Sequence, residues 1–402
     1  MKFTHKNINE GMFRSELIPI DLENKEYYYR MIYSISSSLT SEIVIDFVNS
    51  SRINLFIIES AQVLANSIRL FELGYFDAAY YSMRTSIEVF TILFDVYDYE
   101  DEKIMNNMDK FLNNDYFVRR KQTINYLSEN GIVFNDIKEK MPNFLKEMED
   151  TSQKLNNRVH KSNFENFYIN HKNKCRKEDY RVKCVKEFIT LLKKSIKIVA
   201  VMRLILDPIP LLMDDEEMAY RIPNFMTYSF SKDLLALIGD ETLSEFKSTE
   251  KFIGFKEWIM ELEKRNEYVD AVVMYEFIDL NNLDKIYEQK HLLSDYDLMN
   301  VNIASCSNKI IEIVSSNGFG RYRTSSNNLD VMCNPLRYNQ LDEYFNLEYE
   351  NVFVSLLNID SSMNQTEIFN LFYVFHNEVF TQDEIDKLKQ IDLTEHNYLV
   401  SN

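Results

Sequence analysis

Glycine and proline are scarce in this chain, which has 7 glycines and 6 prolines among 402 residues. Average proteins contain about 7% glycine and about 5% proline. Gly-rich phosphate loops, β-propellers and β-sandwiches with many tight turns all need more of both residues. This composition argues against these architectures and favours long helices with few connections.

Metal and disulfide chemistry also lack the residues they need. The chain has too few and too scattered cysteines for a disulfide framework, and no Cys-x-x-Cys pair to bind zinc; they are Cys175, Cys184, Cys306 and Cys333. No His-Glu-x-x-His, Gly-x-Ser-x-Gly or Walker sequence occurs. We therefore predict no metal site, no cofactor and no P-loop nucleotide hydrolysis.

Long apolar runs are missing as well. The longest candidate, residues 198–206, is shorter than the ~18 residues of a membrane span and contains Arg203. The first residues lack the apolar stretch of a secretory signal. These absences predict a protein without membrane association in a reducing cytoplasm.

The residues that are present indicate helices around a substantial core, because 45% are hydrophobic and 13% aromatic. Apolar residues recur every three or four positions at 57–71, 87–97 and 185–199, which places one apolar stripe on each helix. Gly74 should end the first helix and Asp77 should cap the second. The first two helices should therefore form an antiparallel hairpin.

We expect a mainly α protein, with an N-terminal helical bundle followed by a C-terminal domain of mixed α/β or α+β type. The third long helix should end at Asp207, because two prolines follow it closely. Weaker helical patterns would bring the bundle to five or more helices, at 25–50, 101–112, 119–130 and 135–157 with a break at Pro142. The expected divisions are an extension at 1–25, the bundle at 26–210, a linker at 211–228 and the mixed domain at 229–402.

The pattern changes in the second half of the chain. Short apolar runs at 271–275, 301–304 and 352–357 predict strands, whereas 249–264 and 365–375 predict helices. Apolar runs as short as these fit a strand or a buried helix about equally well. Secondary structure is therefore hardest to predict in the mixed domain.

Arg158 and His160 give the strongest local signal for chemistry. A histidine titrates near neutral pH, and an arginine is a fixed cation that can hold a phosphate. Cleavage of RNA through its 2′-hydroxyl needs a proton acceptor and a positive charge at the phosphorus centre, and it needs no metal. In the alternative interpretation, His160 packs or caps at a helix end and Arg158 lies in solvent.

Arg84 is a third candidate. It stands four residues before Glu88, so the two side chains face each other on a helix. Such a pair within an apolar helix is usually a structural contact between helices. The alternative is that Arg84 faces the loop that carries His160 and joins it in catalysis.

The charge distribution suggests a local site for RNA. The formal net charge is −18, which gives the whole molecule no attraction for nucleic acid, yet 13 Lys and Arg stand against 4 acidic residues in 151–200. The candidate RNA-binding residues near His160 and along the following helix are Lys154, Lys161, Lys186, Lys193 and Lys197. The alternative is a solvated lysine face, or one that docks on the acidic remainder of the chain.

These residues together carry a resemblance to a known family. The turn Gly-Tyr-Phe-Asp-Ala-Ala at 74–79, Met-Arg-Thr-Ser-Ile-Glu at 83–88 and Leu-Asn-Asn-Arg-Val-His-Lys-Ser at 155–162 resemble the HEPN (higher eukaryotes and prokaryotes nucleotide-binding) superfamily. The resemblance covers about residues 50–206 and is closest to bacterial defence or abortive-infection proteins. It implies a helical bundle that forms a homodimer.

Many HEPN proteins are metal-independent endoribonucleases, in which arginine and histidine from both subunits meet in one cleft. Their arginine stands four to six residues before the histidine, whereas Arg158 precedes His160 by two and Lys154 precedes it by six. One hypothesis is an RNA-binding protein or endoribonuclease of defence or toxin type that the C-terminal domain regulates. The other is a non-catalytic adaptor or sensor subunit that binds a partner protein.

Overall fold

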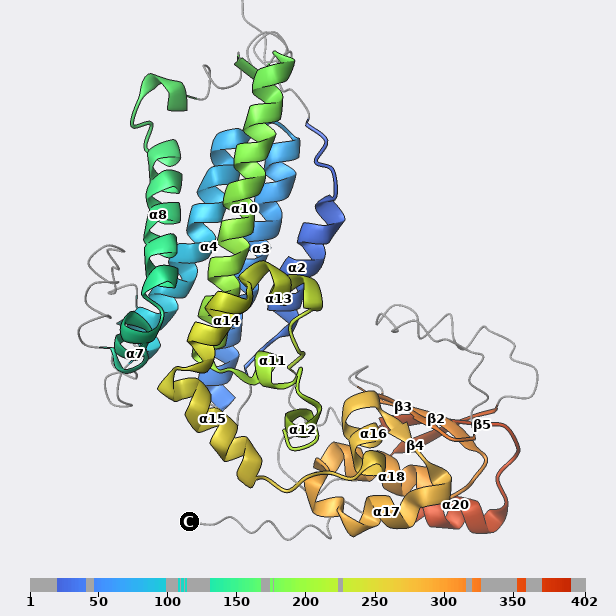
Figure 1. Cartoon of the computed structure of the whole chain (residues 1–402). Helices are drawn as coiled ribbons and strands as arrows, with labels where there is room; N and C mark the ends of the chain where they lie inside the picture. Colours follow the sequence, from blue (N-terminus) through green and yellow to red (C-terminus); the bar gives the residue numbers. More distant parts are fainter. Residues whose placement is uncertain are drawn as a thin grey trace, which may run out of the picture. The chain divides into compact units, whose positions relative to one another are not determined.

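The structure is a computed structural model with two compact units (Figure 1). It describes residues 20–40, 47–98, 108, 110, 111, 113, 131–167, 174, 175, 177–222, 227–315, 320–326, 353–358 and 371–391. The units divide between Leu262 and Glu263, and we call them the helical unit and the mixed unit. The described fold is mainly helical with one small sheet, as the sequence predicted.

A helix hairpin forms the centre of the helical unit. It consists of α3 (Phe47–Glu72) and α4 (Phe76–Tyr97), which pack along each other. The predicted stripe on α3 is fully buried, from Ile57 to Phe71. Gly74 follows α3 with φ +82°, a left-handed conformation that glycine adopts without strain. Asp77 lies in the first turn of α4 and is not its cap, because the helix begins at Phe76, two residues earlier than predicted.

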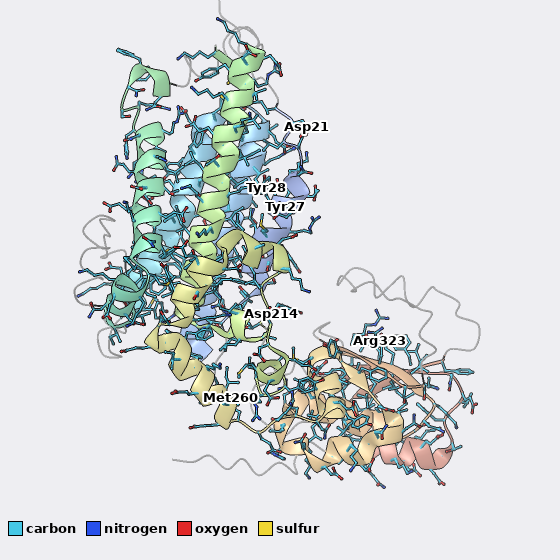
Figure 2. All side chains as sticks on the ribbon, in the orientation of Figure 1. Asp21, Tyr27, Tyr28, Asp214, Met260 and Arg323 are labelled. Atoms are coloured by element: carbon cyan, nitrogen blue, oxygen red, sulfur yellow. The ribbon has the colours of Figure 1, made fainter. Side chains whose placement is uncertain are left out.

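Further helices pack around the hairpin. The 29-residue α10 (Glu178–Leu206) packs against α3, α4, α2 (Lys25–Ser37) and α8 (Pro142–Val159). A short helix, α7 (Ile132–Lys140), precedes α8, so the predicted break at Pro142 is confirmed. Figure 2 shows the side chains that fill the space between these helices, where Tyr28 of α2 is buried.

One buried ion pair fixes the end of α10. Arg203 and Asp207 are both fully buried, and Arg203 Nη1 lies 3.0 Å from Asp207 Oδ2. Arg203 Nε also donates to the backbone carbonyl of Ser38, which follows α2. The charge that interrupts the apolar run at 198–206 therefore joins two parts of the helical unit and has its partners inside the core.

The helical unit extends beyond the predicted linker at 211–228, so the predicted domain boundary is wrong. Leu234, Ile238, Phe246 and Ile259 belong to the same core as the hairpin. The prolines after Asp207 redirect the chain without ending the domain, because apolar residues of the next helices cover the end of the bundle. These helices are α11 (Ile209–Leu212), α12 (Glu216–Ala219), α13 (Lys232–Ile238), α14 (Asp240–Lys247) and α15 (Glu250–Glu261).

The mixed unit has its own core beneath a five-stranded sheet of order β1-β3-β2-β5-β4. The strands are β1 (Phe277–Ile278), β2 (Ile310–Ser315), β3 (Arg321–Thr324), β4 (Phe353–Asn358) and β5 (Leu371–His376). β1 pairs with β3 in parallel, and the other pairs are antiparallel. The helices of this unit are α16 (Glu267–Tyr275), α17 (Leu283–Glu288), α18 (Asp295–Ser305) and α20 (Gln382–Lys389), and Figure 1 shows them on one side of the sheet.

Three predictions for the mixed unit are wrong. Residues 271–275 and 301–304 are helical, within α16 and α18, because each apolar run follows an effective helix cap. Residues 371–375, in the predicted helix 365–375, are strand β5. The predicted strand at 352–357 is confirmed for 353–357, and the predicted helix at 249–264 is α15 of the helical unit.

Some predicted features lie outside the described residues. They include residues 1–19 of the extension, most of 101–112 and all of 119–130. Three single 3₁₀ turns complete the described structure: η2 (Phe164–Asn166), η3 (Leu280–Asn282) and η4 (Lys290–Leu292). Among the described helices, none combines the length and apolar character that a bilayer span requires.

Candidate functional site

His160 is exposed at the point where α8 ends. The helix stops at Val159, and the His160 N–H still donates to the carbonyl of Asn156 at 2.9 Å. Lys161 then adopts a left-handed conformation with φ +53°, which few residues with a side chain do. The chain therefore leaves the helix axis here, and the His160 ring is accessible to solvent.

Arg84 of α4 contacts this histidine. Its Nη1 lies 3.0 Å from His160 Nε2, and its Nε donates to Glu88 Oε1 at 2.7 Å. Arg84 thus forms the predicted ion pair with Glu88 within α4 and also faces the loop that carries His160, whereas its predicted role in catalysis stays a prediction. A guanidinium has no acceptor, so Nε2 must accept here and the ring proton must be on Nδ1.

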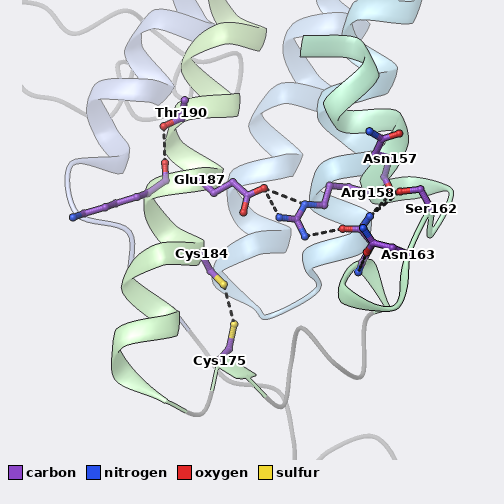
Figure 3. Close-up of polar contacts among 10 residues, drawn as sticks. Asn157, Arg158, Ser162, Asn163, Cys175, Cys184, Glu187 and Thr190 are labelled. Atoms are coloured by element: carbon purple, nitrogen blue, oxygen red, sulfur yellow. Dashed lines mark hydrogen bonds and ion pairs between the residues drawn. The ribbon is translucent and has the colours of Figure 1, made fainter. Parts of the chain in front are cut away.

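Arg158 points to other partners. Its guanidinium forms an ion pair with Glu187 of α10 (Figure 3). It also donates to Asn166 Oδ1 at 3.0 Å and lies over the Tyr80 ring. Burial acts to lower its pKa, but the hydrogen bond and charge of Glu187 outweigh burial and raise it. The described contacts of Arg158 do not include His160. Arg158 therefore anchors α8 to α10, and these contacts give no support to its predicted role in catalysis.

The candidate RNA-binding lysines fall into two groups. Lys154, Lys186 and Lys193 are exposed. Lys197 was predicted to lie with Lys186 and Lys193 on the solvent-exposed side of the helix, and this prediction is wrong. Only 19% of its side chain is exposed, and its Nζ lies 3.0 Å from Glu147 Oε2. Lys161 forms an ion pair with Asp77 of α4.

Carboxylates accompany each of the cations closest to His160. Arg84 pairs with Glu88, Arg158 with Glu187 and Lys161 with Asp77. The sequence could not predict the last two pairs, because their members are 29 and 84 residues apart. The site is therefore a set of ion pairs with one exposed imidazole, and its excess positive charge comes from more distant lysines.

Sequence reasoning missed the exposed aromatic residues near the site. Phe164 and Phe167 follow His160 closely, their side chains are 76% and 42% exposed, and their ring centroids are 5.2 Å apart. Tyr81, three residues before Arg84 on α4, is 56% exposed. Aromatic residues within the polar stretch 156–167 were the available signal, because a polar stretch has no core in which to bury them.

The comparisons with known proteins add no family. No protein-family model matches the chain, and neither the curated proteins nor the solved structures gave a match. Within the residues that the structure describes, no cluster of three or more His, Cys, Asp or Glu side chains has the arrangement to hold a metal ion. The geometry of the site is therefore the basis for any functional inference.

Proposed function

We propose that the helical unit is a HEPN-like, metal-independent endoribonuclease in which His160 and Arg84 form the reactive pair. The observation that carries this proposal is the 3.0 Å contact between Arg84 Nη1 and Nε2 of the exposed His160. Because the reactive arginine is Arg84 of α4, the proposal does not require Arg158, which stands only two residues before His160. The resemblance to defence proteins extends the proposal to a role in bacterial defence.

Arg84 and His160 would act in sequence on a bound phosphodiester. The negative phosphate competes for the Arg84 guanidinium and frees the lone pair of His160 Nε2. Nε2 then takes the proton of the 2′-hydroxyl as its oxygen bonds to phosphorus, and Arg84 stabilises the charge on the phosphate oxygens. The 5′-oxygen leaves as a hydroxyl after taking a proton from water, the proton on His160 Nε2 returns to the solvent, and a 2′,3′-cyclic phosphate remains.

The surroundings of the pair favour a single-stranded substrate. Exposed rings of Phe164, Phe167 and Tyr81 offer faces on which unpaired bases can stack. Lys186 and Lys193 are exposed on α10 and offer positive charge to the backbone. An RNA strand without secondary structure can use both kinds of contact.

The second candidate function is a non-catalytic interaction protein that binds a partner protein. It is favoured by the pairing of Arg84, Arg158 and Lys161 with carboxylates. A phosphate must compete with these carboxylates for each cation, which weakens binding. Under this alternative, the contact between Arg84 and His160 only fixes the end of α8 on α4.

RNA cleavage in the presence of EDTA tests the proposal. We expect the wild-type protein to cut a labelled unstructured RNA and to leave 2′,3′-cyclic phosphate ends. His160→Ala should lower the rate about 100-fold or more, because general acid–base catalysis contributes about 10² to 10⁴. His291→Ala is the matched control, because His291 is an exposed histidine of the mixed unit that pairs with Glu263.

Arg84→Lys should retain only part of the activity, because an ammonium lacks the planar fork that holds two phosphate oxygens. Equal rates for wild type and His160→Ala would exclude the reactive pair. Absence of cleavage by the wild-type protein would favour the interaction protein.

A further inference from the structure

Cys175 and Cys184 form a buried pair of thiols beside the Arg158 anchor. Their Sγ atoms are 3.4 Å apart, and the side chains are 0% and 2% exposed. Cys184 lies near the start of α10, three residues before Glu187, and Cys175 precedes the helix (Figure 3). Neither cysteine forms a disulfide in this structure.

We propose that this pair is an oxidisable dithiol, which hydrogen peroxide converts into a disulfide. The sulfurs of a disulfide are about 2.05 Å apart, so a small movement of two side chains closes the bond. A neighbouring thiol held in contact reacts far more readily than one supplied from solution. This inference is independent of the proposed RNA chemistry.

The pair also has an asymmetry that identifies the first sulfur to react. The hydrogen bond between the two thiols lowers the pKa of Cys175, burial opposes this effect, and the charge of Arg181 adds to it. The thiolate is the nucleophile, so Cys175 reacts first. Cys184 then completes the bond.

The reaction balances with peroxide as the oxidant. The Cys175 thiolate attacks one peroxide oxygen, the O–O bond breaks, and a sulfenic acid forms while the other oxygen leaves as water after taking up a proton. The Cys184 sulfur attacks the sulfenic sulfur and displaces the second water. Two thiols and one peroxide thus yield one disulfide and two waters, and the chain before α10 becomes covalently tied to that helix.

Cys306 of the mixed unit supplies an internal reference. It is also buried, with 8% exposed, but its sulfur lies 3.4 Å from the carbonyl oxygen of Asn302. Burial raises its pKa to about 11, which keeps the thiol protonated and unreactive. Burial alone therefore predicts equal protection of the three described cysteines, whereas a reactive pair predicts selective oxidation at Cys175 and Cys184.

Peptide mapping of the full chain tests the proposal. The protein is treated with hydrogen peroxide, denatured, alkylated and digested with trypsin, which separates the two cysteines because it cuts after Arg176 and Lys183. We expect peptides 175–176 and 184–186 to appear as one disulfide-linked species that dithiothreitol separates. The pair should lose its alkylatable thiols on the order of ten times faster than Cys306.

Two variants sharpen the test. Cys184→Ser should abolish the linked species and leave a sulfenic acid on Cys175 that dimedone traps, whereas Cys306→Ser should leave the linkage unchanged. Equal oxidation rates at Cys175, Cys184 and Cys306, or linkage of Cys175 to a cysteine other than Cys184, would overturn the proposal. Mapping of the wild-type protein decides the question even if a variant does not fold.

Discussion

Lysines on a single helix differ in what they can offer to RNA. Lys186 and Lys193 of α10 are exposed, whereas Lys197 of the same helix is held by Glu147 of α8. Each phosphate contact to single-stranded RNA contributes about 0.7 to the slope of log affinity against log salt. Replacing both Lys186 and Lys193 by alanine should therefore reduce this slope by about 1.4, as measured by fluorescence anisotropy over a range of salt concentrations.

Lys197→Ala is the control at the residue scale. Its charge is already compensated by Glu147, so we expect the salt slope to stay the same. The burial of Glu147 acts to raise its pKa, but its hydrogen bonds with Lys197 and Lys194 outweigh this effect and lower it. If the double variant keeps the wild-type slope, or if Lys197→Ala changes it, the face around Lys186 and Lys193 does not bind the RNA backbone.

The sequence specified part of the candidate site. The spacing of Arg84 and Glu88 predicted their pairing, and the helical pattern that stops at residue 157 predicted a helix end close to His160. The partner of Arg158 could not be predicted, because Glu187 stands 29 residues away on another helix. The prediction for Lys197 was wrong for a similar reason, because its partner Glu147 belongs to a different helix, α8.

At the element scale, helix caps determine whether a short apolar run forms a helix or a strand, which apolar periodicity alone does not predict. The run at 301–304 follows a capping box in which Ser294 and Asp297 exchange hydrogen bonds, and the run at 271–275 follows Asn266, whose side chain accepts from two backbone N–H groups. Both caps are visible in the sequence and predict helices. No comparable signal marked β5, because the alternation of buried residues that defines a strand is short there.

A capping box also makes α20 sensitive to acid. Glu384 accepts hydrogen bonds from the Thr381 N–H at 2.6 Å, from Lys309 Nζ at 2.8 Å and from Ser307 Oγ at 2.7 Å. Lys309 contributes most to lowering the pKa of Glu384 from 4.5 to about 2. A depressed carboxyl pKa stabilises the fold above the unfolded pKa, and this stabilisation is lost as the pH falls through the folded value.

Glu384→Gln should therefore destabilise the mixed unit by about 1 kcal/mol at neutral pH. The difference in free energy of unfolding between wild type and variant should shrink below pH 4.5 and vanish toward pH 2, because protonated glutamate resembles glutamine. Urea unfolding followed by far-UV circular dichroism at several pH values measures it. Leu388→Ala removes a buried apolar side chain of α20, so its effect should vary little with pH. A constant difference for Glu384→Gln would contradict the prediction.

At the scale of the whole molecule, the chain builds two separate hydrophobic cores. Leu64 lies in the core of the helical unit and Ile313 in that of the mixed unit, and both are fully buried. Units with cores of their own can unfold in separate transitions. Trp258 is the single tryptophan of the chain and belongs to α15, so its fluorescence reports on the helical unit alone.

We therefore expect denaturant to unfold the two units in separate steps. Circular dichroism should detect both steps, whereas Trp258 fluorescence should detect one. Leu64→Ala should shift the step seen by Trp258 and Ile313→Ala the other, each by about 2 to 5 kcal/mol, because a buried aliphatic side chain is lost in each case. A single transition seen by both probes, which either substitution shifts equally, would contradict this prediction. The two cores would then unfold as one cooperative unit, and the units on either side of Leu262 would not be independently stable.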